Sequence, residues 1–381
     1  MSGGRIFIYA QDGGGARAIA PVVRTLLKKY PEGVSVITHL FAEEMFREYE
    51  FPVEDLSKIA GKVPLTLPVA RRVLEEISPS IVFCTTSNND QDPSNGEIIR
   101  ASASLGIPCF AMMDHWKGWS RFHDVDGDWS YLPDVLGVID ERALTRGLQE
   151  GISPERMEIV GHPHLEALAT GGHADRKELR EKLGIEDGNV FVCTLFTQPM
   201  REGNGLRPLL EGERLKAVEK ILGTLKDRMH RWGREAVIFV RPHPREMALF
   251  GDIYESLPFG RLETETASLE LAKVSELVLG LDSMILYEAY CCGRPVLSLR
   301  LGKSAGFSDE PDDGFGLWPV AKSLSDLEVF LEELDDDGSI PGAGRMAHAI
   351  PTGAVVACER ILERLCGENS LFSKELRSLS K

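Results

Sequence analysis

The sequence predicts an α/β protein built from two Rossmann-like domains. Its 381 residues are enough for about two domains at roughly 150 residues each. With 43% hydrophobic and 27% charged residues, the composition is that of a folded globular protein. Throughout the chain, short aliphatic runs alternate with amphipathic stretches, which predicts βαβ units and parallel sheets.

The first domain is predicted to span residues 1–168. A strand at residues 5–9 precedes a helical pattern at 17–29. The remaining strands of this domain are expected at 34–40, 80–85, 108–113, 135–139 and 157–160, with helices between most of them.

The second domain is predicted to span residues 169–350, beginning with a Gly-rich linker at 169–175. Its strands are expected at 190–196, 236–240, 277–281 and 295–300, and a long helix at about 211–232. The last segment, residues 351–381, contains a helical pattern that we expect to pack back on the first domain.

Composition and charge exclude several classes of function. No apolar run approaches the ~20 residues that span a bilayer, and the start of the chain has no signal-peptide pattern. Seven scattered cysteines indicate reduced thiols, which predicts a cytoplasmic protein without an integral membrane segment. The formal net charge of −16 disfavours nucleic-acid binding, so a phosphate ligand would have to meet a local basic cluster.

The first predicted strand is followed by three consecutive glycines. Gly14 and Gly15 would let backbone N–H groups approach an anion at a helix N-terminus, and Arg17 adds a positive charge. The pattern is not GxGxxG, and the second strand ends in His39 and Leu40 rather than in an acid, which disfavours an NAD site. A tight turn with a solvated Arg17 is the alternative.

The clearest motif is RPHPR, which follows a predicted buried strand. Arg241, His243 and Arg245 lie within five residues, and the prolines between them hold the loop rigid. Two guanidinium groups and an imidazole at the carboxyl end of a parallel strand are typical of a phosphate site. The alternative for His243 is a purely structural role.

Two further segments contain candidate binding residues. One contributes Asp282, Ser283, Met284 and Glu288, and the other contributes Thr197 and Gln198. Ser283 opens a helix whose free N–H groups could bind a diphosphate, and Glu288 could accept ribose hydroxyls. The alternative is that Ser283 only caps the helix. Thr197 and Gln198 follow the first strand of the second domain and could donate hydrogen bonds to the nucleotide.

The segment MDHWKGW ends a strand of the first domain. Asp114 and His115 are candidates for a catalytic base, and the tryptophans after them either stack on a sugar or pack the loop. The loop at 87–97 could line an acceptor site or be a solvated turn. No Cys/His zinc spacing is present, and Trp129 stands where a calcium loop needs glycine, so we predict no metal site.

Several of these motifs together resemble the GT-B superfamily, and within it the non-hydrolysing UDP-N-acetylglucosamine 2-epimerases and related glycosyltransferases. The similar segments are GARAIAPVVRTL, GHPHLEAL, RPHP and DSMILYEAYCCGRPVLSLR. The resemblance implies two Rossmann-like domains facing each other across a cleft. It also implies that Arg17, His243 and Ser283 contact a diphosphate, and that Glu288 contacts the ribose.

The sequence departs from the epimerase pattern where the family has its catalytic acids. Thr85 and Thr86 end the strand that carries a catalytic aspartate in the family, and MDHWKGW replaces a stretch with a catalytic glutamate. Met284 and Ile285 replace two glycines. These departures favour a metal-independent glycosyltransferase that uses a nucleotide-diphosphate sugar, expected to be a UDP-sugar, as substrate and needs no separate cofactor.

The acceptor would be a carbohydrate or a lipid-linked molecule, and a homodimer is left open. Three alternatives remain at this stage. They are a nucleotide-sugar 2-epimerase or hydrolase, a polyol-phosphate transferase with a CDP-alcohol donor, and a nucleotide-binding protein without activity.

Overall fold

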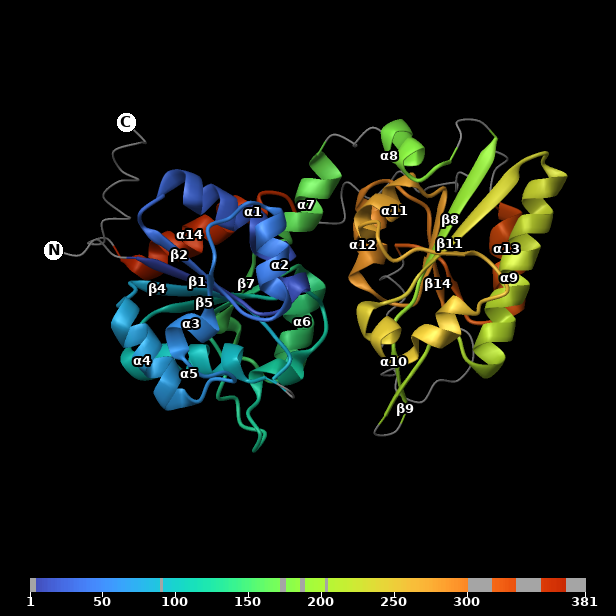
Figure 1. The fold of residues 1–381 in the computed structure, drawn as a ribbon. Coiled ribbons are helices and arrows are strands. Elements are labelled where there is room, and N and C mark those ends of the chain that lie inside the picture. Colours follow the sequence, from blue (N-terminus) through green and yellow to red (C-terminus); the bar gives the residue numbers. More distant parts are fainter. Residues whose placement is uncertain are drawn as a thin grey trace. The chain divides into compact units, whose positions relative to one another are not determined.

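The computed structural model describes residues 5–89, 92–171, 176–185, 189–202, 205–300, 317–333 and 351–367. The chain forms two compact units (Figure 1). Unit 1 contains residues 1–167 and 349–381, and unit 2 contains residues 168–348. Of the predicted linker, residues 172–175 lie outside the described part.

Within the described residues, unit 1 contains a seven-stranded parallel sheet with the order β3-β2-β1-β4-β5-β6-β7. The strands are β1 (Ile6–Ala10), β2 (Val34–Thr38), β3 (Glu54–Asp55), β4 (Ile81–Thr85), β5 (Cys109–Met112), β6 (Val135–Val138) and β7 (Met157–Ile159). The chain crosses from β3 on one edge back to β4 beside β1, so the strand order reverses between the neighbours β1 and β4. Open α/β sheets bind ligands outside the carboxyl ends of the strands at such a point.

Helices cover both faces of this sheet (Figure 1). One face packs against α1 (Gly13–Lys29), α2 (Phe41–Glu48) and α14 (Ala354–Cys366), and the other against α3 (Leu56–Ala60), α4 (Leu67–Ile77) and α5 (Ser94–Leu105). The remaining elements are α6 (Glu141–Gln149), α7 (Pro163–Thr170) and two 3₁₀ turns, Trp119–Phe122 and Pro154–Arg156. Because both faces are covered, β1 and β4 are buried along their full length.

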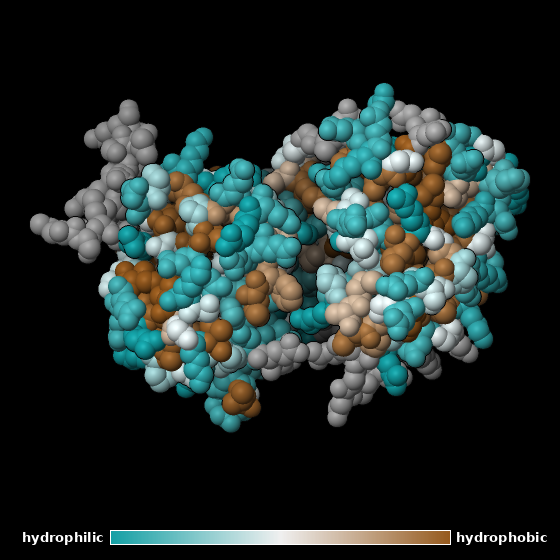
Figure 2. All heavy atoms as spheres, viewed as in Figure 1, coloured by the Kyte–Doolittle hydropathy of each residue, from teal (hydrophilic) through white to brown (hydrophobic). Residues whose placement is uncertain are grey.

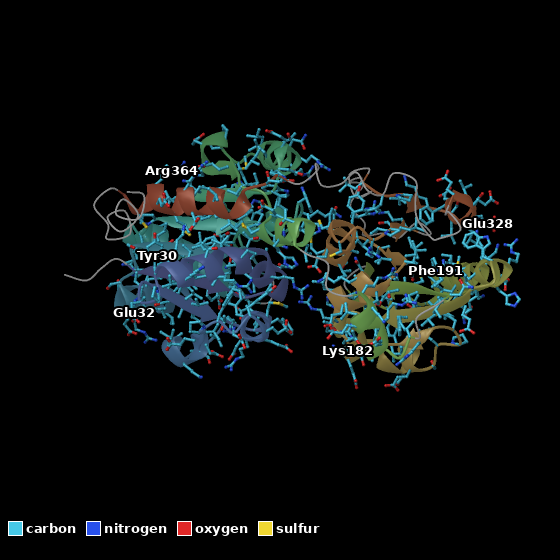
Figure 3. The ribbon with its side chains drawn as sticks, turned by 90° about the horizontal axis from the view of Figure 1, so that it is seen from above. Tyr30, Glu32, Lys182, Phe191, Glu328 and Arg364 are labelled. Atoms are coloured by element: carbon cyan, nitrogen blue, oxygen red, sulfur yellow. The ribbon has the colours of Figure 1, made fainter. Side chains whose placement is uncertain are left out.

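The C-terminal helix α14 is held to unit 1 by polar contacts as well as by apolar packing. The carboxylate of Glu166 accepts hydrogen bonds from the backbone N–H groups of Gly353 (2.5 Å) and Ala354 (2.8 Å), which satisfies donors at the start of α14. Arg364 forms an ion pair with Glu158 near the other end of the helix. Figure 3 shows α14, on which Arg364 is labelled, lying alongside α1.

Unit 2 contains a second parallel sheet, with six strands among the described residues and the order β12-β11-β8-β13-β14-β15. The strands are β8 (Val190–Phe196), β11 (Glu235–Arg241), β12 (Arg261–Leu262), β13 (Leu277–Gly280), β14 (Val296–Leu299) and β15 (Val320–Ala321). An antiparallel pair, β9 (Met200–Glu202) and β10 (Gly205–Arg207), follows β8. The two parallel sheets confirm the predicted fold class of two Rossmann-like domains.

Helices also cover both faces of the sheet in unit 2. The long helix α9 (Gly212–Arg231) and α13 (Leu324–Glu333) share one core with the sheet, while α8 (Arg176–Lys182), α11 (Ser268–Val274) and α12 (Met284–Cys291) cover the other face. Helix α10 (Pro244–Glu255) follows β11. Gly280 lets α12 approach β13, because a Cβ at this position would lie 2.9 Å from Cδ2 of Leu286.

No helix in the described part of the chain is both long and apolar enough to cross a membrane. On the face drawn in Figure 2, hydrophilic residues predominate on each unit and hydrophobic residues form patches among them. All seven cysteines lie in the described part as free thiols, and six of them are buried.

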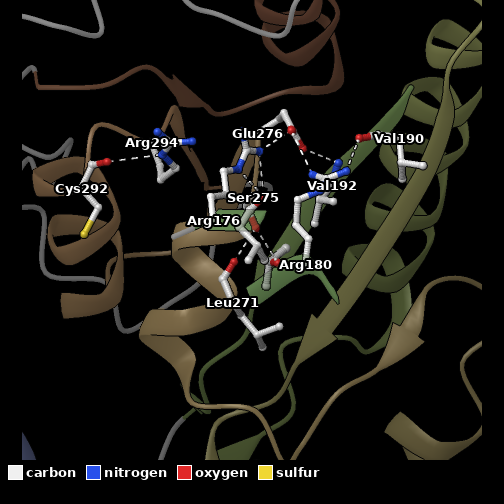
Figure 4. A network of polar contacts seen from close by, with 11 residues as sticks. Arg176, Arg180, Val190, Val192, Leu271, Ser275, Glu276, Cys292 and Arg294 are labelled. Atoms are coloured by element: carbon white, nitrogen blue, oxygen red, sulfur yellow. Dashed lines mark hydrogen bonds and ion pairs between the residues drawn. The ribbon is translucent and has the colours of Figure 1, made fainter. Parts of the chain in front are cut away.

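A partly buried carboxylate anchors α8 to the sheet of unit 2 at the amino end of β13 (Figure 4). Glu276 binds both Arg176 and Arg180 through Oε1, with 3.3 Å to Nη1 of Arg180. Its Oε2 accepts a 2.6 Å hydrogen bond from the backbone N–H of Val192 in β8. Arg180 also donates to the carbonyl of Val190 at 3.0 Å, so two charged side chains join α8, β8 and β13.

We predict that Glu276→Gln lowers the free energy of unfolding of unit 2 by about 3 kcal/mol, because it leaves the buried Arg180 guanidinium without its counter-charge. Urea unfolding followed by circular dichroism measures the change. Lys182→Ala is the matched control on the same helix, since the exposed Lys182–Glu270 pair contributes about 0–1 kcal/mol. Equal unfolding free energies for the two variants would contradict this account of the anchor.

Candidate functional site

At the carboxyl edge of the sheet in unit 2, residues that follow three different strands come together. The backbone N–H of Thr197, after β8, donates to the carbonyl of Arg241 at the end of β11 (3.1 Å). The side-chain amide of Gln198 donates to Oδ1 of Asp282, which follows β13. Four of the residues predicted from sequence therefore lie at one edge, at the crossover point of this sheet.

The RPHPR motif forms the tight connection from β11 to α10. Arg241 lies at the end of β11 and donates from Nη1 to the carbonyl of Glu263 (3.1 Å), which fixes its guanidinium. His243 is the N-cap of α10, and its Nδ1 accepts the backbone N–H of Arg245 at 3.1 Å. A neutral imidazole in this position carries its proton on Nε2 and is a hydrogen-bond donor.

The charge state of His243 follows from its surroundings. Partial burial, together with the positive charge of Arg245, lowers the pKa of His243 below its ordinary value of about 6.5. The ring is therefore neutral at pH 7. The motif thus offers the guanidinium of Arg241 and a neutral N–H donor from His243. The exposed Arg245 lies in the first turn of α10.

A fully buried carboxylate, not predicted from the sequence, holds the connection between β11 and α10 in place. Glu246 in the first turn of α10 accepts hydrogen bonds from the hydroxyl of Thr197, the backbone N–H of Leu209 (2.8 Å) and the hydroxyl of Tyr254 (2.6 Å). Burial and the neighbouring carboxylate raise the pKa of Tyr254, so its hydroxyl stays protonated as a donor. Glu246 therefore fixes the start of α10 relative to the end of β8.

The third component of this edge is the start of α12. Ser283 is the N-cap, and its Oγ accepts the N–H of Ile285 at 3.4 Å, so the predicted capping role is present. Its hydroxyl hydrogen remains available for donation to a ligand. Asp282 and Met284 beside it are half-buried, while Glu288 lies one turn further into the helix and is 3% exposed.

In unit 1, the predicted glycine loop forms the first turn of α1 at the carboxyl edge. A Cβ at Gly15 would lie 2.8 Å from Cβ of Thr85, and one at Gly14 would lie 3.1 Å from Oδ2 of Asp114. The glycines therefore let α1 begin directly against the ends of β4 and β5. Arg17 lies in the same first turns and is half-buried.

Asp114 forms a buried ion pair that the sequence did not reveal. Nη1 of Arg121 lies 2.6 Å from Oδ1 of Asp114 and 2.9 Å from Oγ1 of Thr86. Burial alone would raise the pKa of Asp114, but the charge and hydrogen bond of Arg121 outweigh it and hold the pKa below its ordinary value. A carboxylate with a lowered pKa is a weak base, so this geometry favours Asp114 as a fixed negative charge rather than as a proton acceptor.

His115 is half-buried beside it, and its Nδ1 accepts the backbone N–H of Lys117 at 3.1 Å. A neutral ring so placed donates from Nε2 and cannot accept a proton there. Trp116 and Trp119 are each 6% exposed, and the indole N–H of Trp119 donates to the carbonyl of Trp116 at 3.2 Å. This burial favours the alternative in which the tryptophans pack the loop.

A second buried polar cluster lies at the same edge of unit 1, between β2, the start of α1 and the start of α5. Gln11 donates from Nε2 to the carbonyl of Asp92 (3.0 Å), and its Oε1 accepts the N–H of Asn95 and the hydroxyl of Tyr9, each at 3.1 Å. Nε2 of His39 lies 2.9 Å from Oδ2 of Asp92. The described residues of the loop at 87–97 thus include buried members of the edge, which differs from a solvated turn.

Comparisons with known proteins agree on the fold. No protein-family model matches the sequence, and no curated protein sequence resembles it significantly. The structure is similar to the UDP-GlcNAc 2-epimerase of Neisseria meningitidis bound to UDP-GlcNAc, with a TM-score of 0.65 and 16% identity over 94% of this chain and 100% of that one. The chain has the epimerase fold. The resemblance inferred from the motifs is thereby confirmed at the level of the fold.

Two further structures extend this likeness. The UDP-GlcNAc 2-epimerase of Methanocaldococcus jannaschii, in complex with UDP-GlcNAc and UDP, has a TM-score of 0.63 and 17% identity, over 94% of this chain and 99% of that one. The Anabaena HepE protein, in complex with UDP and glucose, has a TM-score of 0.61 and 14% identity, over 95% of this chain and 99% of that one. The described residues include no group of three or more His, Cys, Asp or Glu side chains placed to hold a metal ion.

The ion pair of Asp114 predicts how the stability of unit 1 depends on pH. Because the folded pKa of Asp114 is below its unfolded value, its stabilising contribution is complete above the unfolded pKa of about 3.9 and is lost as the pH falls through the folded pKa. Asp114→Asn should therefore cost about 3 kcal/mol at pH 7 and progressively less below about pH 4. Denaturant unfolding of both proteins between pH 7 and pH 3 measures the difference.

Glu43→Gln serves as the control, since its pair with Arg47 lies on the surface of α2 and contributes about 0.5 kcal/mol. A difference between Asp114→Asn and the wild type that stays constant down to pH 3 would show that the ion pair does not lower the pKa of Asp114.

Proposed function

We propose that the protein is an enzyme that breaks the bond between the sugar and the diphosphate of a nucleotide-diphosphate sugar, with a UDP-sugar as its substrate. The observation that carries this proposal is the convergence of Arg241, the Nε2–H donor of His243 and the N-terminus of α12 at one edge of unit 2. The solved structures of similar fold bind UDP-GlcNAc or UDP, which supports the same choice of ligand.

The chemistry of this edge suits a diphosphate leaving group. Negative charge grows on the diphosphate as the sugar leaves, and a guanidinium, a neutral N–H donor and a helix N-terminus stabilise it without reorganisation. Ser283 can add its hydroxyl hydrogen, and Thr197 and Gln198 are fixed beside it by Glu246 and Asp282. In this proposal Glu288 binds the ribose. Within unit 1, Gly14, Gly15 and Arg17 form a separate helix start whose N–H groups suit an anion. The nucleotide sugar is the substrate, and no separate cofactor is invoked.

Among reactions of this class, the comparisons favour one that needs no second substrate. The similar structures include UDP-GlcNAc 2-epimerases, so the first candidate is a nucleotide-sugar epimerase or hydrolase. The second candidate is transfer of the sugar to a carbohydrate or lipid-linked acceptor. It is favoured by the end of β4, where Thr85 and Thr86 stand in place of a carboxylate, and by the pairing of Asp114 with Arg121.

We expect Arg241→Ala and His243→Ala each to weaken the binding of UDP by about 1.5–3 kcal/mol, because each removes a hydrogen bond to a charged phosphate. Titration calorimetry measures the dissociation constants, with CDP and GDP as alternative ligands. Lys226→Ala is the control, since it removes an exposed positive charge from α9 in the same unit. If both site variants bind UDP as tightly as the control does, the diphosphate is not held by this motif.

Incubation of the purified protein with UDP-GlcNAc alone in D₂O separates the candidate reactions. An epimerase exchanges the hydrogen at C2 for deuterium, and a hydrolase releases UDP and free sugar. Nuclear magnetic resonance follows both products. Neither product would appear in the absence of an acceptor if the protein is a glycosyltransferase, and tight binding of CDP in place of UDP would point to a CDP-alcohol donor.

A further inference from the structure

The hydroxyl group of Thr197 has a fixed hydrogen-bond direction, because it faces a buried carboxylate. Thr197 follows β8 at the carboxyl edge of unit 2 and is 4% exposed, and its hydroxyl donates to Oε2 of Glu246. Oε1 of Glu246 accepts the backbone N–H of Leu209 (2.8 Å) and the hydroxyl of Tyr254 (2.6 Å). Three donors from different parts of unit 2 therefore converge on one carboxylate that is fully buried.

The carboxylate of Glu246 holds the proton of Thr197 firmly. Its charge is stabilised by these three hydrogen bonds and by its position in the first turn of α10, where the helix dipole favours an acid. A buried charged group that loses a hydrogen-bond donor pays the cost of its missing solvation. A ligand that took the hydroxyl hydrogen of Thr197 would therefore have to compete with Glu246 for it.

The consequence for Thr197 is that only its oxygen lone pairs remain for a ligand. A threonine hydroxyl has a single hydrogen, and here that hydrogen is given to Glu246. The predicted donation from the Thr197 hydroxyl to the nucleotide is thus replaced by acceptance. The partner of this oxygen must carry a hydrogen itself.

The next residue is oriented in a similar way by a second carboxylate. The side-chain amide nitrogen of Gln198 donates to Oδ1 of Asp282, because an ionised carboxylate accepts hydrogen bonds and cannot donate them. The amide oxygen of Gln198 remains as an acceptor, and its side chain is half-buried. The segment after β8 therefore presents two acceptor oxygens in sequence.

These acceptors lie between the groups that we propose to bind the diphosphate. Strand β8 pairs with β11 on one side and with β13 on the other, so the segment after it lies between the RPHPR motif and the start of α12. The backbone N–H of Thr197 also donates to the carbonyl of Arg241 at 3.1 Å. Ionised phosphate oxygens are acceptors, so they do not form a hydrogen bond with the oxygen of Thr197.

We propose that Glu246 is a positioning residue that holds Thr197 as a hydrogen-bond acceptor, so that this edge of unit 2 selects ligands with a hydroxyl or N–H group beside the diphosphate. The inference rests on the proposed function and deepens it. A nucleotide-diphosphate sugar carries such groups on its sugar and on its nucleoside. Dimethyl diphosphate, with one methyl ester on each phosphate, has the same diphosphate diester and no hydrogen to donate, and it serves as the contrasting probe.

Thr197→Val keeps the shape of the side chain and removes the acceptor oxygen. It should weaken the binding of UDP-GlcNAc by about 3–10-fold and leave that of dimethyl diphosphate within about twofold of the wild type. Thr197→Ser restores the hydroxyl and should recover most of the affinity. Thr224→Val is the matched control, since the hydroxyl of Thr224 donates to the carbonyl of Lys220 within α9 (2.9 Å).

Glu246→Gln should give a result that a merely structural role would not produce. Leu209 and Tyr254 still donate to the position of Oε1, so the new amide oxygen takes that place and the amide nitrogen faces Thr197. Thr197 then accepts from the amide, and its own hydrogen becomes available to a ligand. This variant should bind UDP-GlcNAc about 3–10-fold more weakly and dimethyl diphosphate more tightly than the wild type. Equal losses for both ligands would mean that Glu246 acts only on the fold, and would overturn the inference.

Titration calorimetry on the full chain measures the dissociation constants, and thermal unfolding shows that each variant is folded. UDP is the third ligand and locates the donor. A loss for UDP and UDP-GlcNAc alike in Thr197→Val assigns it to the ribose or the base, and a loss for UDP-GlcNAc alone assigns it to the sugar. Unchanged binding of both by Thr197→Val would overturn the inference while leaving the proposed function intact. Failure of the wild type to bind UDP or UDP-GlcNAc would remove the proposed function and this inference together.

Discussion

The constraint on which the rest of the structure depends is that parallel strands deliver their following loops to one edge of the sheet. In unit 1 this brings together the loops after β1, β2, β4 and β5, and in unit 2 those after β8, β11 and β13. Side chains that are far apart in the sequence thus become neighbours without any local motif joining them. Thr197 and Glu246 are one instance, and His39 and Asp92 are another.

Buried carboxylates then fix the geometry of each edge. Glu246, Asp114 and Asp92 are all removed from water, which would be costly for an unpaired charge. Each one is satisfied by donors from different elements, so the carboxylate acts as a joint between a strand end and a helix start. The groups that we propose as ligand-binding residues are therefore held in place by carboxylates that do not themselves have to touch a ligand.

The sequence was sufficient to predict the fold class and most of the long strands, because buried parallel strands appear as apolar runs of the right length. The two-residue strands β3, β12 and β15 were missed, since two residues carry no periodicity. The three-residue strands β9 and β10 were not predicted either. The motif RPHPR was recognisable because its residues are adjacent in the chain.

The parts of the site that sequence reasoning missed depend on tertiary contacts. Nothing in the sequence near Asp114 shows that Arg121 turns back onto it, and so the effect on its pKa was invisible. His39 was considered only as a residue standing where an NAD site needs an acid. The roles of Gly14, Arg17, Met284 and Glu288 stay predictions.

The capping of α14 by Glu166 has a consequence for the synthesis of the chain. Helix α14 supplies Cys358, Ile361 and Leu362 to the core of unit 1, although all of unit 2 separates them in the sequence from the strands they cover. On the ribosome, unit 2 can therefore assemble from a continuous segment while the apolar face of α1 still awaits its last partner. Nascent chains that stall before α14 would expose that face, and they would be natural clients for chaperones that bind apolar surfaces.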